Sequence, residues 1–221
     1  TISTEISSTP HRLIGQKNSF LKEVCVMNEN IDVMRRKVKK YLDKNRYNHT
    51  LGVMYTAGAL AMRYGADLNR ALTAGLLHDC AKCIPNDKKI RMCKKNHIFI
   101  TPAEEANPSL LHAKLGAFLA AKKYHIGDRT ILNAIACHTT GKPEMTLLDK
   151  ILYIADYIEP NRAELPDMSE ARRLAFEDID ECLYLLLRDS LVYLQTKGLP
   201  VDPATEKTYN YYKKYLGKKE E

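Results

Sequence analysis

Apolar residues recur at three- and four-residue steps along most of the sequence, and this period is the strongest constraint on the fold. Near the start of the periodic part the pattern is formed by Ile31, Met34, Val38, Tyr41 and Leu42, a spacing that lines one face of an α-helix. No segment alternates apolar and polar residues, and no Asn-Gly or Asp-Gly dipeptide is present to form a hairpin turn. The sequence therefore predicts an all-α fold.

Capping residues, glycines and prolines divide this pattern into separate helices. Gly65 is expected to stop one helix, Asp67 or Asn69 to cap the next, and Ser109 to cap a later one. The predicted helices are 45–64, 71–78, 86–96, one from 110 onward, 128–137, 147–158, a long amphipathic stretch over 169–195, and a tyrosine-rich helix from 202 or 205 to 216.

The length of 221 residues suits a single domain. Residues 29–221 are expected to form it, and residues 1–28, which lack a clean period, are expected to be a mobile leader or a start-site extension. The N-terminal residues lack the apolar core of a secretory signal, and no apolar run approaches the ~20 residues that span a bilayer. We therefore expect a cytoplasmic protein without membrane segments.

The net charge of +7 favours an anionic partner, either a phosphorylated small molecule or nucleic acid. The densest basic run, between Arg35 and Arg46, contains few aromatic residues and is interpreted as a solvated helix face, which makes nucleic acid the weaker option. The six cysteines are scattered and expected to be reduced. Cys80 and Cys83 form a C-x2-C pair, but because no second pair accompanies them a packing role is favoured over a zinc site.

Metal-capable side chains interrupt several of the apolar stretches. They are His49, His78, Asp79, His112, His138 and Asp156. Each one alone is more often an ordinary core or rim residue than a ligand. Burying all of them in one core is costly unless something pairs with them, and a bound cation would supply that partner.

The order His, His-Asp, His, His, Asp on successive helices is the pattern of the HD-domain metal-dependent phosphohydrolases. The sequence resembles one branch of these enzymes, the YqeK family, over residues 31 to 215. The resemblance rests on the segments His49–Val53, His78–Lys82, Leu110–Ala113, Cys137–Pro143 and, most specifically, Ala155–Arg162.

This resemblance implies an HD-domain helical bundle that hydrolyses diadenosine tetraphosphate symmetrically to two ADP. It implies that His49, His78, Asp79 and Asp156 bind a divalent metal, with iron in a dinuclear centre as the expected occupant and manganese as an alternative. His112 and His138 would bind either a second metal ion or the substrate phosphates, and the sequence leaves both roles open.

The residues assigned to catalysis and substrate binding follow from the same resemblance. A bound metal would neutralise the polyphosphate and make hydroxide available near neutral pH. Asp79 would accept a proton, and Lys82 and Arg162 would bind the phosphate charge. Thr139 would contact a phosphate, and Tyr209 and Asn210 lie in a segment expected to close over the nucleoside, although these tyrosines could equally be core or homodimer contacts.

Other functions remain open at this point. A different HD phosphohydrolase could act on guanosine polyphosphates or nucleoside monophosphates. A non-catalytic HD module that binds nucleotide or RNA is less favoured, because every expected ligand is present. Asp149 lies seven residues before Asp156, nearly on the same helix face, and is a rival carboxylate with an equally good structural explanation.

Overall fold

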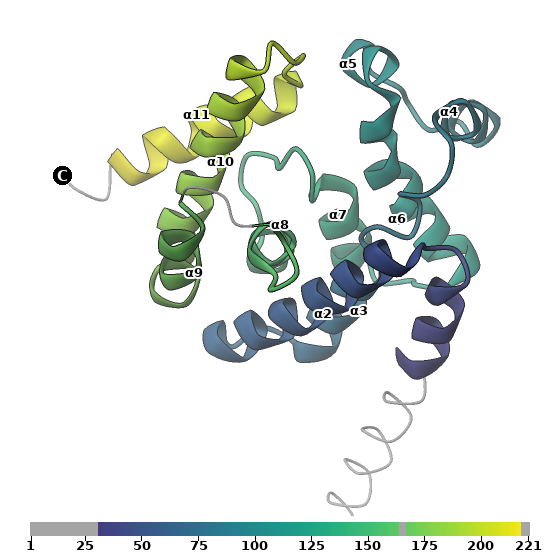
Figure 1. Ribbon diagram of the computed structural model, residues 1–221, viewed down its shortest axis with the longest axis horizontal. Helices are drawn as coiled ribbons and strands as arrows, with labels where there is room; N and C mark the ends of the chain where they lie inside the picture. Colours follow the sequence, from purple (N-terminus) through teal and green to yellow (C-terminus); the bar gives the residue numbers. More distant parts are fainter. Residues whose placement is uncertain (1–30, 164–166, 218–221) are drawn as a thin grey trace, which may run out of the picture.

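The computed structural model describes residues 31–163 and 167–217, and within these ranges the chain forms helices and no strand (Figure 1). The predicted all-α fold is confirmed. The predicted leader, residues 1–28, lies outside the described ranges. Residues 31–39 are helical and lead into the first complete helix.

Helices α2 (Lys44–Tyr64) and α3 (Leu68–Leu77) form an antiparallel hairpin. Asp43 begins α2 by accepting a hydrogen bond from the Arg46 N–H, and Gly65 ends it in the left-handed conformation at φ 68°. Gly75 lets the two helices approach closely, because a Cβ atom at this position would lie 2.7 Å from the Met54 Cα.

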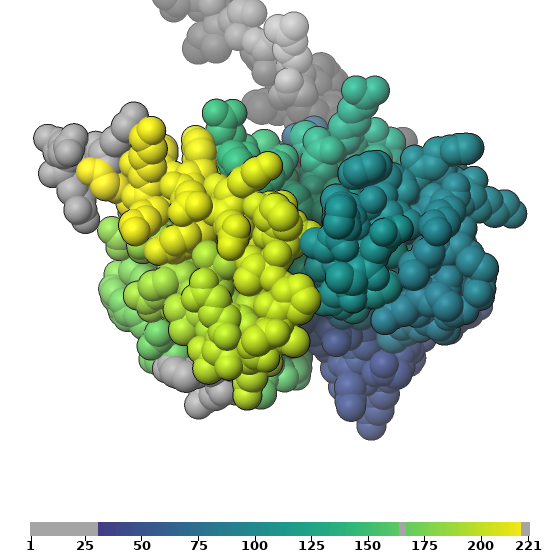
Figure 2. Space-filling view, turned by 90° about the horizontal axis from the view of Figure 1, so that it is seen from above, coloured from purple at the N-terminus to yellow at the C-terminus, as the bar shows by residue number. Residues whose placement is uncertain are grey.

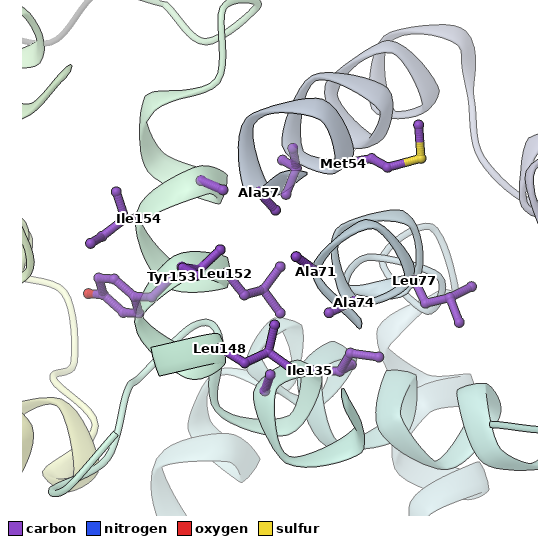
Figure 3. Close-up of a cluster of buried hydrophobic side chains, with 14 of the residues drawn as sticks. Met54, Ala57, Ala71, Ala74, Leu77, Ile135, Leu148, Leu152, Tyr153 and Ile154 are labelled. Atoms are coloured by element: carbon purple, nitrogen blue, oxygen red, sulfur yellow. The ribbon is translucent and has the colours of Figure 1, made fainter. Parts of the chain in front are cut away.

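Helices α7 (Arg129–Cys137) and α8 (Leu147–Ile158) pack on this hairpin and form the middle of the core, to which α6 (Leu111–Lys123) and α10 (Ile179–Thr196) also contribute buried leucines. In Figure 3, Leu152 of α8 points toward Ala71 and Ala74 of α3, whereas Tyr153 points to the opposite side of α8. Helix α8 is therefore buried on several sides, which explains its almost continuous apolar sequence.

The outer helices lie on either side of this core (Figure 1). One side carries α4 (Asn86–Lys95), α5 (Pro102–Ala106) and α6, and the other carries α9 (Met168–Glu177), α10 and α11 (Pro203–Gly217). The connection between α10 and α11 comes up beside α5, and Figure 2 shows the two surfaces adjoining.

Two boundary predictions are wrong. The stretch predicted over 169–195 is two helices that break at Asp178, whose carboxylate accepts hydrogen bonds from the N–H groups of Asp180 and Glu181 and so starts α10. Ser109 does not cap α6: it lies in a 3-10 turn (Pro108–Leu110), and its hydroxyl donates to Asn107. Over the described ranges, no helix is long and apolar enough to cross a membrane.

Candidate metal centre

The predicted ligands converge from different helices on one buried point. His49 lies within α2 and His112 in the first turn of α6, while Asp156 lies within α8. His78 and His138 stand at the C-terminal ends of α3 and α7, and Asp79 follows His78 directly. All of these side chains are buried except that of Asp156, which is 18% exposed.

Asp79 stands between two groups of imidazoles. Its Oδ2 atom lies 3.8 Å from the His49 Nε2 atom and 3.5 Å from the His78 Nε2 atom. Its Oδ1 atom lies 3.2 Å from the His112 Nε2 atom and 3.7 Å from the His138 Nε2 atom. Each carboxylate oxygen therefore faces its own pair of ring nitrogens.

Asp156 joins the first of these groups. Its Oδ1 atom lies 3.0 Å from the His49 Nε2 atom and 3.7 Å from the His78 Nε2 atom. In the second group, the His112 and His138 Nε2 atoms lie 3.2 Å apart. The structure thus gathers the predicted ligands around Asp79. Three groups of donor atoms are close enough to hold a metal ion: His49, His78 and Asp79; His78, His138 and Asp156; and Asp79, His112 and His138.

Three histidines are oriented by backbone carbonyls three residues earlier in the chain. The Nδ1 atoms of His78, His112 and His138 lie 2.7, 2.6 and 2.7 Å from the carbonyl oxygens of Gly75, Ser109 and Ile135. A carbonyl can only accept, so Nδ1 carries the proton and the Nε2 lone pair faces the centre. For His78 and His138 the carbonyl is available because the last carbonyls of a helix lack intrahelical partners.

His49 needs a different partner because it lies inside α2, where the preceding carbonyls are used by the helix. Its Nδ1 atom lies 3.0 Å from Oε1 of Glu159, a fully buried residue just past the end of α8. The other oxygen of Glu159 accepts hydrogen bonds from the backbone N–H and the side-chain amide of Asn161, at 2.7 and 2.9 Å. Gly52 makes room, because a Cβ atom there would lie 2.0 Å from the Glu159 Oε2 atom.

The electrostatics of the centre suit a cation. Burial raises the pKa of Asp79, but the surrounding His78, His112 and His138 outweigh burial and hold it well below the usual range. Burial lowers the pKa of His112 to about 4, so this imidazole is neutral at physiological pH. Burial also lowers the pKa of His49, but the neighbouring carboxylates of Asp156 and Glu159 together outweigh burial, and the net pKa is raised.

The donor atoms fit a divalent metal. His49 Nε2, His78 Nε2 and Asp79 Oδ1 are buried and make no hydrogen bond, a costly arrangement that a bound cation would relieve. Imidazole and carboxylate together suit iron, manganese or zinc better than calcium, which takes oxygen ligands. Cys80 and Cys83 take no part: both thiols are free, and their sulfur atoms contact the Gly116 carbonyl and the Asp43 carboxylate.

Basic side chains surround the two carboxylates. Arg162 lies 3.0 Å from the Asp156 Oδ1 atom, and Lys82 lies 3.2 Å from the His112 Nε2 atom and 4.0 Å from the Asp79 Oδ1 atom. Arg46, which the sequence analysis assigned to a solvated helix face, donates to the Asp79 Oδ2 atom at 2.8 Å. Arg46, His49 and Arg162 line a cavity of about 490 Å³, which forms the entrance to the metal centre. Asp43 and Glu159 also line this cavity, and the guanidinium groups of Arg46 and Arg162 suit phosphate groups.

The remaining predicted residues are only partly at the centre. The Thr139 hydroxyl lies 3.3 Å from the His112 Nε2 atom and 3.2 Å from the His138 Nε2 atom. Tyr209 stacks on Tyr184 of α10 at 5.6 Å between ring centroids, and Asn210 is exposed, so their predicted contact with a nucleoside stays a prediction.

Asp149 is a structural residue. It forms a reciprocal cap with Thr146 at the start of α8, and its Oδ2 atom lies 2.9 Å from the Lys142 ammonium. These contacts hold its Oδ2 atom, which agrees with the structural interpretation of the sequence, while its Oδ1 atom is buried without a hydrogen bond.

Comparison with known proteins agrees with this geometry. Residues 46–161 match the HD domain family. A symmetrical bis(5'-nucleosyl)-tetraphosphatase of Bacillus subtilis is 43% identical over 176 residues, covering 79% of this chain and 92% of that protein. One of Halalkalibacterium halodurans is 39% identical and covers 78% and 91%.

A solved structure leads to the same class. A predicted HD superfamily hydrolase from Clostridium acetobutylicum, described as involved in NAD metabolism, superposes with a TM-score of 0.80 at 40% identity, covering 83% of this chain and 97% of that one. The fold and the histidine–aspartate cluster define an HD-domain hydrolase. Within that class, the chain belongs to the YqeK family of symmetrical bis(5'-nucleosyl)-tetraphosphatases.

Proposed function

We propose that this protein hydrolyses diadenosine tetraphosphate to two ADP at a dinuclear metal centre. The observation that carries the proposal is the position of Asp79, whose two oxygens each face a separate set of ligands. The relatives that match most of the chain bear the name of this activity.

The two ligand sets define where the ions would be held. His49, His78 and Asp79 would hold one ion together with Asp156, whose Oδ1 atom lies 3.0 Å from the His49 Nε2 atom, and Asp79, His112 and His138 would hold the second. Divalent ions bound there would neutralise phosphate oxygens and supply hydroxide near neutral pH. We propose iron as the occupant and manganese as its substitute, since both accept this donor set.

The chain's own cations would bind and orient the polyphosphate. Arg46 and Arg162 are held by Asp79 and Asp156 at the entrance, and anionic phosphates would compete for the same guanidinium groups. Lys82 and Thr139 stand on the His112 side, where the ammonium would stabilise charge that develops on the attacked phosphoryl group. The depressed pKa of Asp79 makes it a weak proton acceptor and favours its role as the shared ligand.

Product analysis tests the proposal directly. Protein purified in the absence of oxygen would be analysed for its metal content. It would then be incubated with diadenosine tetraphosphate in the presence of iron or manganese ions. We expect ADP as the product from the start of the reaction. AMP together with ATP, or no cleavage, would reject symmetrical hydrolysis.

A second candidate is another HD phosphohydrolase activity. The Clostridium relative carries a description that mentions NAD metabolism. The same assay should therefore include NAD, guanosine polyphosphates and nucleoside monophosphates. A turnover rate higher with one of these than with the tetraphosphate would favour this alternative.

A cytoplasmic location and a homodimer are further proposals. The free thiols of Cys80, Cys83, Cys93, Cys137 and Cys182 suit a reducing compartment. Light scattering during gel filtration would measure the oligomeric state.

A further inference from the structure

A second cavity adjoins the metal centre, and none of the roles assigned above uses it. Its volume is about 670 Å³, and α2, the segment after α8 and α9 form its walls. The lining is mainly apolar and aromatic, with Leu51, Tyr55, Pro160 and Phe176 among its residues. Cavities of this size and character are typical of small-molecule sites.

The two cavities adjoin at Asn161 and are lined by neighbouring residues of α2. Arg46 and His49 line the cavity at the metal centre, and Asn48, Gly52 and Tyr55 line the apolar one. Asn161 lines both, and its side-chain amide hydrogen-bonds Glu159 and the Asn48 carbonyl. At a rise of ~1.5 Å per residue, Tyr55 lies roughly 9 Å along the helix from His49.

The apolar cavity presents aromatic rings to solvent. Tyr55 is 58% exposed and Phe176 is 40% exposed. Exposed rings beside an anion-binding site are suited to stack on a planar base, because every base offers a π-face. Asn48 and Asn161 also line this cavity, and Asn161 lines the cavity of the arginines as well. Their polar groups would contact the sugar hydroxyls of a nucleotide that spans both cavities.

We propose that this cavity binds the nucleoside of a nucleoside diphosphate whose phosphates lie between Arg46 and Arg162. That this nucleoside diphosphate is one half of diadenosine tetraphosphate rests on the proposed function. The base lies against Tyr55 and Phe176. Because a symmetrical substrate has two such halves, the other half extends to the side of Lys82 and Thr139.

Binding measurements distinguish the contacts to the nucleoside from the contacts to the phosphates. The full-length, manganese-loaded protein would be titrated with ADP and with pyrophosphate in a calorimeter. We expect Tyr55→Ala to weaken ADP binding about tenfold or more, the usual loss when one stacked base loses its ring, and to leave pyrophosphate binding unchanged. Tyr193→Ala is the matched control, since Tyr193 is a 55% exposed tyrosine on α10 outside the cavity, and it should change neither affinity.

A second variant tests the space itself. Ala59 lines the far end of the cavity, so Ala59→Leu should narrow it and also weaken ADP binding selectively. The proposal is overturned if both variants bind ADP as tightly as the wild type does. It is also overturned if the variants lose affinity for ADP and for pyrophosphate equally. If ADP binding depends on Tyr55 but the wild type does not cleave the tetraphosphate, the cavity assignment stands and the proposed reaction fails.

Discussion

At the scale of single residues, Glu159 determines how His49 faces the metal centre. It is the fully buried partner of the His49 Nδ1 atom. Glu159→Gln keeps the shape but removes the charge, and we expect metal affinity or activity to fall about 10- to 100-fold. Metal titration would measure the loss, with Glu105→Gln, an exposed position on α5, as the control.

Gly52 offers an independent test of the same contact. Gly52→Ala would place a Cβ atom 2.0 Å from the Glu159 Oε2 atom and force that carboxylate away. We expect a loss of bound metal similar to that of Glu159→Gln. Gly127→Ala is the control, because a Cβ atom there meets nothing within 4 Å. Full metal content in Gly52→Ala would show that the Glu159 contact is dispensable.

The buried His112 predicts a pH dependence in the metal-free protein. Its pKa is about 4 in the folded chain and 6.5 in the reference state, so between these values the unfolded chain binds a proton that the folded chain does not. Relative to His112→Gln, the wild type should lose stability as pH falls from 6.5 to 4, by about 3 kcal/mol at most. Urea unfolding of both proteins with a chelator would measure this, and a difference that does not vary with pH would contradict it.

The sequence singled out the candidate ligands but not everything that orients them. His49, His78, Asp79, His112, His138 and Asp156 were detectable because polar metal-binding residues stand out in apolar stretches. Arg46 and Glu159 were not, because one lies in a basic run and the other in a polar segment after α8, where charged residues are usual. Only the fold shows that both point inward.

At the scale of helices, the sequence predicts the bounds of a helix best where a strong stop residue ends it. The bounds of α2 and α8 were predicted closely, because Gly65 and Pro160 are strong stop signals. Helix α5 was missed, because a five-residue helix is too short to show a period. The break between α9 and α10 was missed because the apolar period continues across Asp178.

Asp178 therefore offers a test at this scale. Its carboxylate accepts two backbone hydrogen bonds at the start of α10. Asp178→Ala should lower the free energy of unfolding by about 1 kcal/mol, a typical cost of losing an N-cap. Urea unfolding would measure this beside Lys207→Ala, an exposed position on α11 that should be neutral. Equal midpoints for the two variants would show that the cap is not needed.

At the scale of the whole molecule, the metal centre links helices that otherwise pack through apolar contacts. Without metal, the unpaired atoms of His49, His78 and Asp79 remain buried together. Metal binds the folded state only. Manganese at a hundred times its dissociation constant should therefore raise the free energy of unfolding by about 2.7 kcal/mol and raise Tm by roughly 5–10 °C. Thermal melts with and without a chelator would measure the shift.

The control for this prediction removes the shared ligand. Asp79→Asn keeps the volume of the side chain but loses the charge that faces both groups of imidazoles. We expect manganese to leave its Tm nearly unchanged. If manganese raised the Tm of this variant as much as that of the wild type, the stabilising ion would bind elsewhere.

The contact between His49 and Glu159 joins residues 110 positions apart in the chain. During synthesis, the N-terminal ligands emerge from the ribosome long before the residues that orient and complete the site. A nascent chain that has reached only His78 and Asp79 has no assembled centre to load. Metal uptake would therefore come after translation of α8, and metal content would distinguish finished chains from prematurely terminated ones.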